Sequence, residues 1–186
     1  TESHLMLSRE LNVRLRSHAR KMGVGLASLL HLAWAQVVSK TSGQEQVVFG
    51  TVLLGRMQGG SGSDQVMGLF INTLPLRIDV GERSVEESVR HTQADLAALL
   101  DHEQASLALA QRCSGVAPGV PLFNTLLNCR NNSGESEMTS DIAGIIVADE
   151  QKHTNFPISM SIDDFGTDLS LTSQAIHPID AQRLCD

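Results

Sequence analysis

Residues 46–80, QVVFGTVLLGRMQGGSGSDQVMGLFINTLPLRIDV, decide the fold of this 186-residue chain. The stretch contains two apolar runs, residues 47–54 and 67–78. Both are rich in β-branched and large aliphatic residues, which predicts two strands. Between them, residues 55–64 hold four glycines and two serines and are too flexible for regular structure. A strand, a glycine-rich loop and a second strand are therefore expected at the centre of the domain.

Two helices are predicted before this stretch. Apolar residues recur at helical spacing on one face of residues 7–22, whereas residues 26–40 are apolar on nearly every side, as in a buried helix. Gly23 and Gly43 suit the C-terminal ends of these helices. The order helix, helix, strand predicts an α/β fold.

The rest of the chain continues this alternation. Ser84 and Glu87 form a capping box for a third helix, whose buried side is expected to carry Val85, Val89, Leu96, Leu99 and Leu100. A short helix is expected over residues 104–112, and residues 130–137 are expected to form an exposed loop. Strands are expected at residues 122–127, 142–147, 156–162 and 169–172, the last two as a hairpin. A final helix is expected to begin at residues 178–180.

Composition narrows the class of protein. The length suits one domain or one large lobe, and an aromatic content of 3% requires an aliphatic core. The net charge of −7 argues against nucleic acid binding, and no apolar run approaches the ~18 residues of a membrane span. Three widely spaced cysteines without a CxxC motif indicate reduced thiols in a cytosolic protein. The first residue is Thr1 rather than Met, so we expect the chain to be cut from something larger.

Common catalytic motifs are absent from the sequence. It contains no GxSxG, no GxxxxGK[ST] and no HExxH, and no lysine follows the glycine-rich loop. The histidines have no metal-ligand spacing, so no metal site is predicted. The loop at residues 55–62 is therefore interpreted as an active-site or interface loop rather than a phosphate-binding loop.

Several polar residues remain open to two interpretations. His91 and Asp95 form an HxxxD pattern, which is either a solvated pair on a helix or a general base with its supporting acid. His102 lies at a helix break and is either a capping residue or a functional one. Asn72 lies in an apolar run, and its amide either fixes the strand against a loop or donates to a ligand carbonyl. Asn124 and Asn128 pose the same question.

Four segments, taken together, resemble one family. Residues 67–77, MGLFINTLPLR, resemble the GxFxNTxxxR motif of the condensation domains of nonribosomal peptide synthetases. Residues 101–107, DHEQASL, resemble the next motif, with Glu103 inserted before Gln104 and Ser106 where proline is common. Residues 121–128, PLFNTLLN, resemble the motif after that. Residues 48–56, VFGTVLLGR, resemble the strand that enters the floor loop of such domains.

The resemblance implies a fold and a reaction. It implies the C-terminal half, residues 1–186, of a V-shaped domain built from two chloramphenicol-acetyltransferase-like lobes, each with a mixed sheet flanked by helices. Such domains form a peptide bond between a donor and an acceptor amine, each carried on the 4′-phosphopantetheine arm of a carrier protein. No cofactor is expected to bind the chain directly. The family's HHxxxDG motif lies in the N-terminal lobe, and no adjacent histidine pair occurs here, so no catalytic residue is expected in this chain and the chain alone is expected to be inactive.

The resemblance also implies site residues in this half. The floor loop is expected at about residues 55–66. The candidates for the floor loop and the tunnel wall are Arg56, Gly68, Asn72, His102, Gln104, Asn124 and Asn128.

Partners and rival functions follow from the same resemblance. We expect the chain to contact the N-terminal lobe, carrier proteins and an adjacent adenylation domain, and to self-associate through the surface that this lobe would cover. The run at residues 107–112 is similar to the subgroup that both epimerises and condenses. The alternatives are a non-catalytic docking lobe, an epimerisation domain, or a standalone acyltransferase that uses His91 or His102. A bacterial, cytoplasmic protein is expected.

Overall fold

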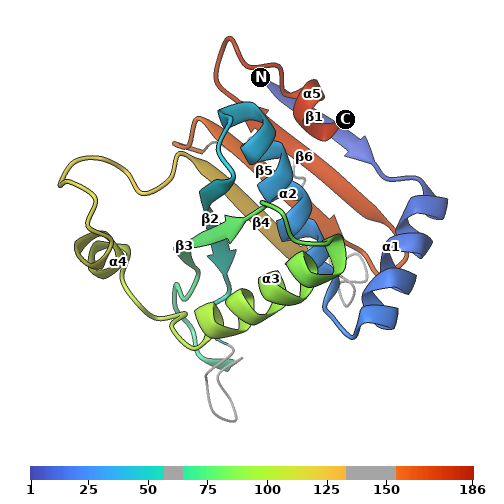
Figure 1. Ribbon diagram of the computed structural model, residues 1–186, viewed down its shortest axis with the longest axis horizontal. Helices are drawn as coiled ribbons and strands as arrows, with labels where there is room; N and C mark the ends of the chain where they lie inside the picture. Colours follow the sequence, from blue (N-terminus) through green and yellow to red (C-terminus); the bar gives the residue numbers. More distant parts are fainter. Residues whose placement is uncertain (57–64, 133–153) are drawn as a thin grey trace, which may run out of the picture.

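The computed structural model describes residues 1–56, 65–132 and 154–186, which form one mixed sheet with the longer helices packed on one face and one short helix, residues 107–113, off to the side (Figure 1). The strands are β1 (Glu2–Met6), β2 (Gln46–Leu53), β3 (Asn72–Asp79), β4 (Thr125–Asn131), β5 (Ile158–Asp164) and β6 (Leu169–Ala175). The helices are α1 (Arg9–Met22), α2 (Leu26–Ser42), α3 (Val85–Leu100), α4 (Leu107–Cys113) and α5 (Gln182–Cys185). The strand order is β1-β6-β5-β4-β2-β3. Strand β4 is parallel to both β2 and β5, and the other pairs are antiparallel. The predicted α/β class and mixed sheet are confirmed.

The core lies between the sheet and helices α2 and α3. Alternate residues of each strand point to this side, and Phe49, Leu127 and Leu169 are fully buried there. Trp34 and Val89 close the core from α2 and α3. The side chains are mostly aliphatic, as the composition predicts, and the buried face positions β2 and β3 rigidly on either side of the glycine-rich loop.

Helix ends follow the predicted capping residues. Gly23 and Gly43 end α1 and α2 with φ of 67° and 70°, a region that only glycine adopts without strain. Both hydrogen bonds of the Ser84–Glu87 capping box are present at the start of α3. Val85, predicted to be buried, is instead 67% exposed, because the first turn of α3 projects its side chain away from the sheet.

Strand and helix starts account for most differences from the sequence predictions. The run at residues 67–78 becomes a strand only at Asn72, the residue that pairs with the last residue of β2. Within the described residues no strand pairs with Met67 or Leu69, and these side chains are 96% and 91% exposed. The helix predicted at residues 104–112 begins at Leu107, because Ser106 caps it.

Three further predictions at strands need comment. Strand β1 was not predicted, because its polar residues alternate beside β6 and give little hydrophobic signal. Strand β4 begins three residues later than predicted and includes Arg130, which was expected in a loop; its guanidinium pairs with Asp163 of β5 at 2.6 Å. The hairpin of β5 and β6 is confirmed. The predicted strand at residues 142–147 lies outside the described residues.

No single helix in the described ranges has the length and apolar content of a membrane span; α1 and α2 meet that test only as a pair bent by 110°.

His31 is a buried histidine with both ring nitrogens engaged. Its Nδ1 lies 2.7 Å from the Ala27 carbonyl, so Nδ1 carries the proton, and Nε2 accepts from the Thr51 hydroxyl at 2.7 Å. Burial lowers the pKa of His31 from 6.5, although the bond to Ala27 acts in the opposite direction. His31 is therefore a core histidine held by two hydrogen bonds.

We therefore expect the free energy of unfolding to fall as the pH drops below about 6.5. The unfolded chain takes up a proton at His31 there, whereas the folded chain does not, and the slope contributed by this group is at most about 1.4 kcal/mol per pH unit. Urea unfolding at pH 7.5, 6.5 and 5.5 measures this. His31→Gln should be less stable at pH 7.5 and should lose this part of the slope. An unchanged slope in the variant would assign the pH dependence to other groups.

Candidate functional site

The amide of Asn72 joins the start of β3 to the turn that follows α3. Its Nδ2 donates to the carbonyls of Glu103 and Ala105 at 2.8 and 2.7 Å, and its Oδ1 accepts from the Thr73 N–H at 2.9 Å. Both amide protons are used within the protein. Of the two interpretations left open by the sequence, the structure supports fixation of the strand against a loop.

Gln104 joins the turn that follows α3 to the end of β2, where the glycine-rich loop begins. Its Nε2 donates to the Gly55 carbonyl at 2.5 Å. Gly55 follows β2 with φ of 69°, and a Cβ on it would lie 1.9 Å from the Phe70 carbonyl oxygen. Residues 101–105 thus hold the exit of β2 through Gly55 and the entry of β3 through Asn72. We call this group of contacts the loop clamp.

Arg56 and Gly68 lie at the two ends of the predicted floor loop. The Arg56 guanidinium stacks over the Phe70 ring, 4.5 Å from its centroid. Gly68 has φ of 154°, and a Cβ there would lie 3.0 Å from the same ring. Residues 57–64, most of the predicted floor loop at 55–66, lie outside the described residues. Its described ends therefore converge on Phe70.

Sequence reasoning gave no role to Glu103, which the structure places in the loop clamp. Glu103 is 1% exposed, although glutamate is seldom buried. Its backbone carbonyl is one of the two acceptors for Asn72. The only signal in the sequence was its insertion between His102 and Gln104 of the motif.

The side chains of the other three candidates make none of the contacts of the loop clamp, although His102 lies in its turn. His102 is exposed at one end of a groove between α3 and β3. Asn124 is exposed just before β4, beside Phe123, whose ring stacks with Phe156 at 5.6 Å. Asn128 lies within β4, and its Cα partner is Ser161. The structure therefore brings together four of the seven predicted residues, leaves the His102 side chain exposed on the same turn, and places Asn124 and Asn128 elsewhere.

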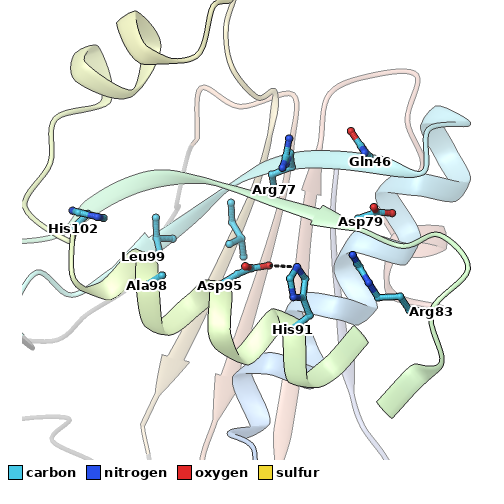
Figure 2. Close-up of a pocket in the computed structure, with 10 residues that line it drawn as sticks. Gln46, Arg77, Asp79, Arg83, His91, Asp95, Ala98, Leu99 and His102 are labelled. Atoms are coloured by element: carbon cyan, nitrogen blue, oxygen red, sulfur yellow. Dashed lines mark ion pairs between the residues drawn. The ribbon is translucent and has the colours of Figure 1, made fainter. Parts of the chain in front are cut away.

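The HxxxD residues, His91 and Asp95, form a solvated pair on a helix, which is the first of the two interpretations left open by the sequence. His91 Nε2 lies 3.7 Å from Asp95 Oδ2 on the outer face of α3, and the two side chains are 53% and 33% exposed. Figure 2 shows the pair below strand β3, at the groove that His102 also lines. An exposed pair at this separation is held weakly.

Cysteine and metal chemistry find little support in the described part of the chain. Burial, with the nearby Asp163 charge, raises the pKa of the Cys129 thiol to about 12, so this thiol stays protonated. No group of three or more histidine, cysteine or carboxylate residues in the described ranges could hold a metal ion. The contacts of the loop clamp are suited to holding a loop against the sheet.

Comparison with known sequences gives a family. A family model described as "Condensation domain" matches residues 1–175. Malpinin synthetase and malpibaldin synthetase of Mortierella alpina are 59% and 55% identical over 185 residues, which is 100% of this chain. Vanchrobactin synthetase of Vibrio anguillarum is 30% identical over 87% of the chain. The chain spans only 2% to 6% of the length of these three relatives.

Solved structures share the fold. A four-domain nonribosomal peptide synthetase bound to AMP and glycine matches 99% of this chain and 15% of its own, with a TM-score of 0.81 and 16% identity. The condensation domain of a monacolin K polyketide synthase matches 95% of this chain and 41% of its own, with a TM-score of 0.75 and 18% identity. The expectation of a bacterial source is not supported, because the relatives at 59% and 55% identity come from a fungus.

Proposed function

The chain belongs to the condensation domain family, and from this we propose that it is the C-terminal lobe of a domain that joins two carrier-bound substrates by a peptide bond. In this proposal the lobe forms one wall of the substrate tunnel, the floor loop and the latch that crosses to the other lobe. The 41% of the monacolin K condensation domain that it matches is consistent with one lobe of two.

The loop clamp is the observation that carries the proposal. Three segments with family motifs meet there through Asn72, Gln104 and Gly55, although 31 to 49 positions separate the bonded residues in sequence. The contacts fix both ends of the glycine-rich loop relative to the sheet. A loop held at both ends can serve as a positioned wall for tethered substrates.

The proposed reaction is aminolysis of a thioester. The acceptor amine attacks the donor carbonyl, a C–N bond forms, the C–S bond breaks, and the amine proton leaves with the thiol of the pantetheine arm. The lobe contributes position and dipoles, because the HHxxxDG motif is absent from its sequence and is expected in the N-terminal lobe. The 4′-phosphopantetheine arms arrive on carrier proteins, and the lobe binds no cofactor of its own.

An apolar surface beside the floor loop supports the proposed partner. The exposed apolar residues at the two ends of this loop are Leu54, Val66, Met67, Leu69 and Ile71. Exposed apolar clusters mark interfaces. We propose that the N-terminal lobe covers this surface, that the isolated lobe self-associates through it, and that carrier and adenylation domains contact other faces. A cytoplasmic location and the dual epimerisation and condensation subgroup belong to the same proposal.

The chain alone is expected to give no peptide product from loaded carrier proteins. The same chain joined to an N-terminal lobe with an intact HHxxxDG motif is expected to give product, measured by mass spectrometry of the released peptide. Product from the chain alone would contradict the proposal that the N-terminal lobe supplies the catalytic residues and this lobe only the tunnel wall. A joined protein that folds and binds carriers but forms no peptide would support the alternative, a docking lobe without chemistry.

His91→Ala and His102→Ala in the joined protein test a third possibility, an acyltransferase that uses one of these histidines as its base. Because both side chains are exposed and neither makes a contact of the loop clamp, each variant should keep its rate within about twofold of the parent. A loss of 100-fold or more at either position, on the order expected for removal of a general base, would instead favour an acyltransferase with its base in this lobe.

A further inference from the structure

Hydrogen bonds link a hydroxyl, an imidazole and a carboxylate on strands β1 and β6. The Thr172 Oγ1 lies 2.9 Å from His4 Nδ1, and His4 Nε2 lies 2.7 Å from Glu2 Oε1. Glu2 Oε2 in turn accepts from Gln174 Nε2 at 2.6 Å. Groups joined in this order have the geometry of a nucleophile, its general base and the group that orients the base. We call Glu2, His4 and Thr172 the β1–β6 triad.

The β1–β6 triad lies on the face of the sheet opposite the core. His4 and Thr172 are Cα partners, and their sequence neighbours Leu5 and Leu171 pack against the core. Because side chains alternate along a strand, His4 and Thr172 point away from the core. Strands β1 and β6 begin the sheet order and β3 ends it, so the triad and the loop clamp lie at opposite edges of the sheet (Figure 1). None of the triad residues has a role in the proposed function.

The contacts of His4 determine which of its ring nitrogens carries the proton. An ionised carboxylate only accepts hydrogen bonds, so Nε2 of the neutral ring carries the proton and donates to Glu2. Nδ1 is then an acceptor, and the Thr172 hydroxyl donates to it. This is the tautomer that a general base requires, because its lone pair faces the proton to be removed. The bond from Gln174 holds the Glu2 carboxylate in the position that selects this tautomer.

A second hydroxyl stands beside Thr172, and the triad is open to solvent. Ser161 is the Cα partner of Thr172 on β5, so its side chain lies on the same face of the sheet. The Ser161 hydroxyl makes no hydrogen bond within the described residues, and it can donate to negative charge that develops on a substrate oxygen. The His4 and Glu2 side chains are 67% and 43% exposed. A small substrate therefore reaches the Thr172 hydroxyl from solvent.

We propose that the β1–β6 triad hydrolyses small carboxylic esters, with Thr172 as the nucleophile and His4 as the general base. Thr172 Oγ1 attacks the carbonyl carbon, a C–O bond forms, and the hydroxyl proton passes to His4 Nδ1. The C–O bond of the ester then breaks, and the alcohol leaves with the proton from Nδ1. Water attacks the acyl group on Thr172 in the same way, releases the carboxylic acid and returns a proton to Oγ1. Glu2 and Gln174 are positioning residues, and the reaction consumes only the ester and water.

The test measures hydrolysis of p-nitrophenyl acetate by the 186-residue chain. The chain should hydrolyse this ester faster than free imidazole at the same concentration as its histidines. Thr172→Val and His4→Gln should each lower kcat/KM about 100-fold, as removal of a nucleophile or its general base does. Thr172→Ser keeps a hydroxyl and should stay within about tenfold of the parent. His18→Gln removes another exposed histidine, on α1, and should leave the rate unchanged.

Variants of Glu2 test its positioning role. In Glu2→Gln the neutral amide can donate to Nε2 and favour the wrong tautomer, so kcat should fall about tenfold or more while KM stays unchanged. Glu2→Asp keeps the carboxylate and should recover part of kcat. Equal values of kcat in Glu2→Gln and the parent would remove Glu2 from the proposed site.

The acyl intermediate provides a readout that does not depend on the rate. Mass spectrometry of protein quenched with acid during turnover should find an acetyl group on Thr172, and Thr172→Val should lack it. Circular dichroism checks that each variant is folded. Hydrolysis no faster than with free imidazole, a parent-like rate in folded Thr172→Val, acetyl groups confined to other residues, or an equal loss in His18→Gln would each overturn the proposal.

Discussion

Replacing Gly55 with alanine is expected to lower the free energy of unfolding by about 2–4 kcal/mol, through a backbone conformation unfavourable to alanine and an overpacked contact. Gly55 has φ of 69°, where a side chain is strained. The added Cβ would lie 1.9 Å from the Phe70 carbonyl oxygen and 2.8 Å from its carbon. These are backbone atoms and cannot rotate aside, so the exit of β2 and the segment around Phe70 must separate.

The same change should impair the proposed reaction in the assembled domain. The Gly55 carbonyl accepts from Gln104, so a shift of Gly55 breaks one side of the loop clamp and releases one end of the floor loop. We expect peptide formation to fall about 100-fold, as misplacement of about 1 Å can cause. Urea unfolding and a condensation assay on the joined lobes measure the two effects.

Gly43→Ala is the matched control for Gly55→Ala. Gly43 has φ of 70°, almost the same as Gly55, but a Cβ on it meets nothing within 4 Å. This variant should lose only the conformational part, about 1 kcal/mol, and should keep its activity. Equal losses in the two variants would show that the contact with Phe70 contributes nothing.

The spacing of apolar residues and the capping residues predicted the helices, because both act within a few positions along the chain. The spacing of apolar residues gave α1 and α2, and the capping box gave the start of α3 to the residue. Where each strand begins depends on its neighbour. The start of β3 at Asn72 is set by the end of β2 at Leu53. Residues 67–71 contain no local signal that predicts where β3 begins. Strand β1 is held beside β6, nearly the whole chain away, and was missed for the same reason.

The site was predictable only as a set of motif residues. The resemblance identified Asn72 and Gln104, but their acceptors lie 31 to 49 positions away, and spacing alone does not show which carbonyl an amide will meet. Asn124 and Asn128 belong to an equally clear motif and yet lie apart from the loop clamp. A motif therefore indicated which residues matter to the family, whereas the contacts distinguished the residues that hold the loop.

Asn72→Ala is expected to lower the free energy of unfolding by about 2–4 kcal/mol, because each buried acceptor left without a donor costs about 1–3 kcal/mol and partial rearrangement recovers some of it. The carbonyls of Glu103 and Ala105 would both lose their donor. Asn72→Asp should be no better, since a carboxylate of the same shape would face two carbonyl oxygens. Asn128→Ala, whose amide makes no hydrogen bond within the described residues, should cost less than about 1 kcal/mol.

Stability and activity together discriminate the two roles that an amide at position 72 can have. If Asn72 holds the loop clamp, Asn72→Ala loses stability and activity together, and hydrogen exchange in the turn at residues 101–105 becomes faster. If the amide instead donates to a substrate carbonyl, activity falls while the urea midpoint and the exchange in the turn stay unchanged. Because both amide protons are already bonded to carbonyls of the turn, donation to a substrate would require Asn72 to give up one of them. A variant that is inactive but fully stable would therefore show that the turn opens during the reaction, and the clamp would then be a moving part rather than a fixed support.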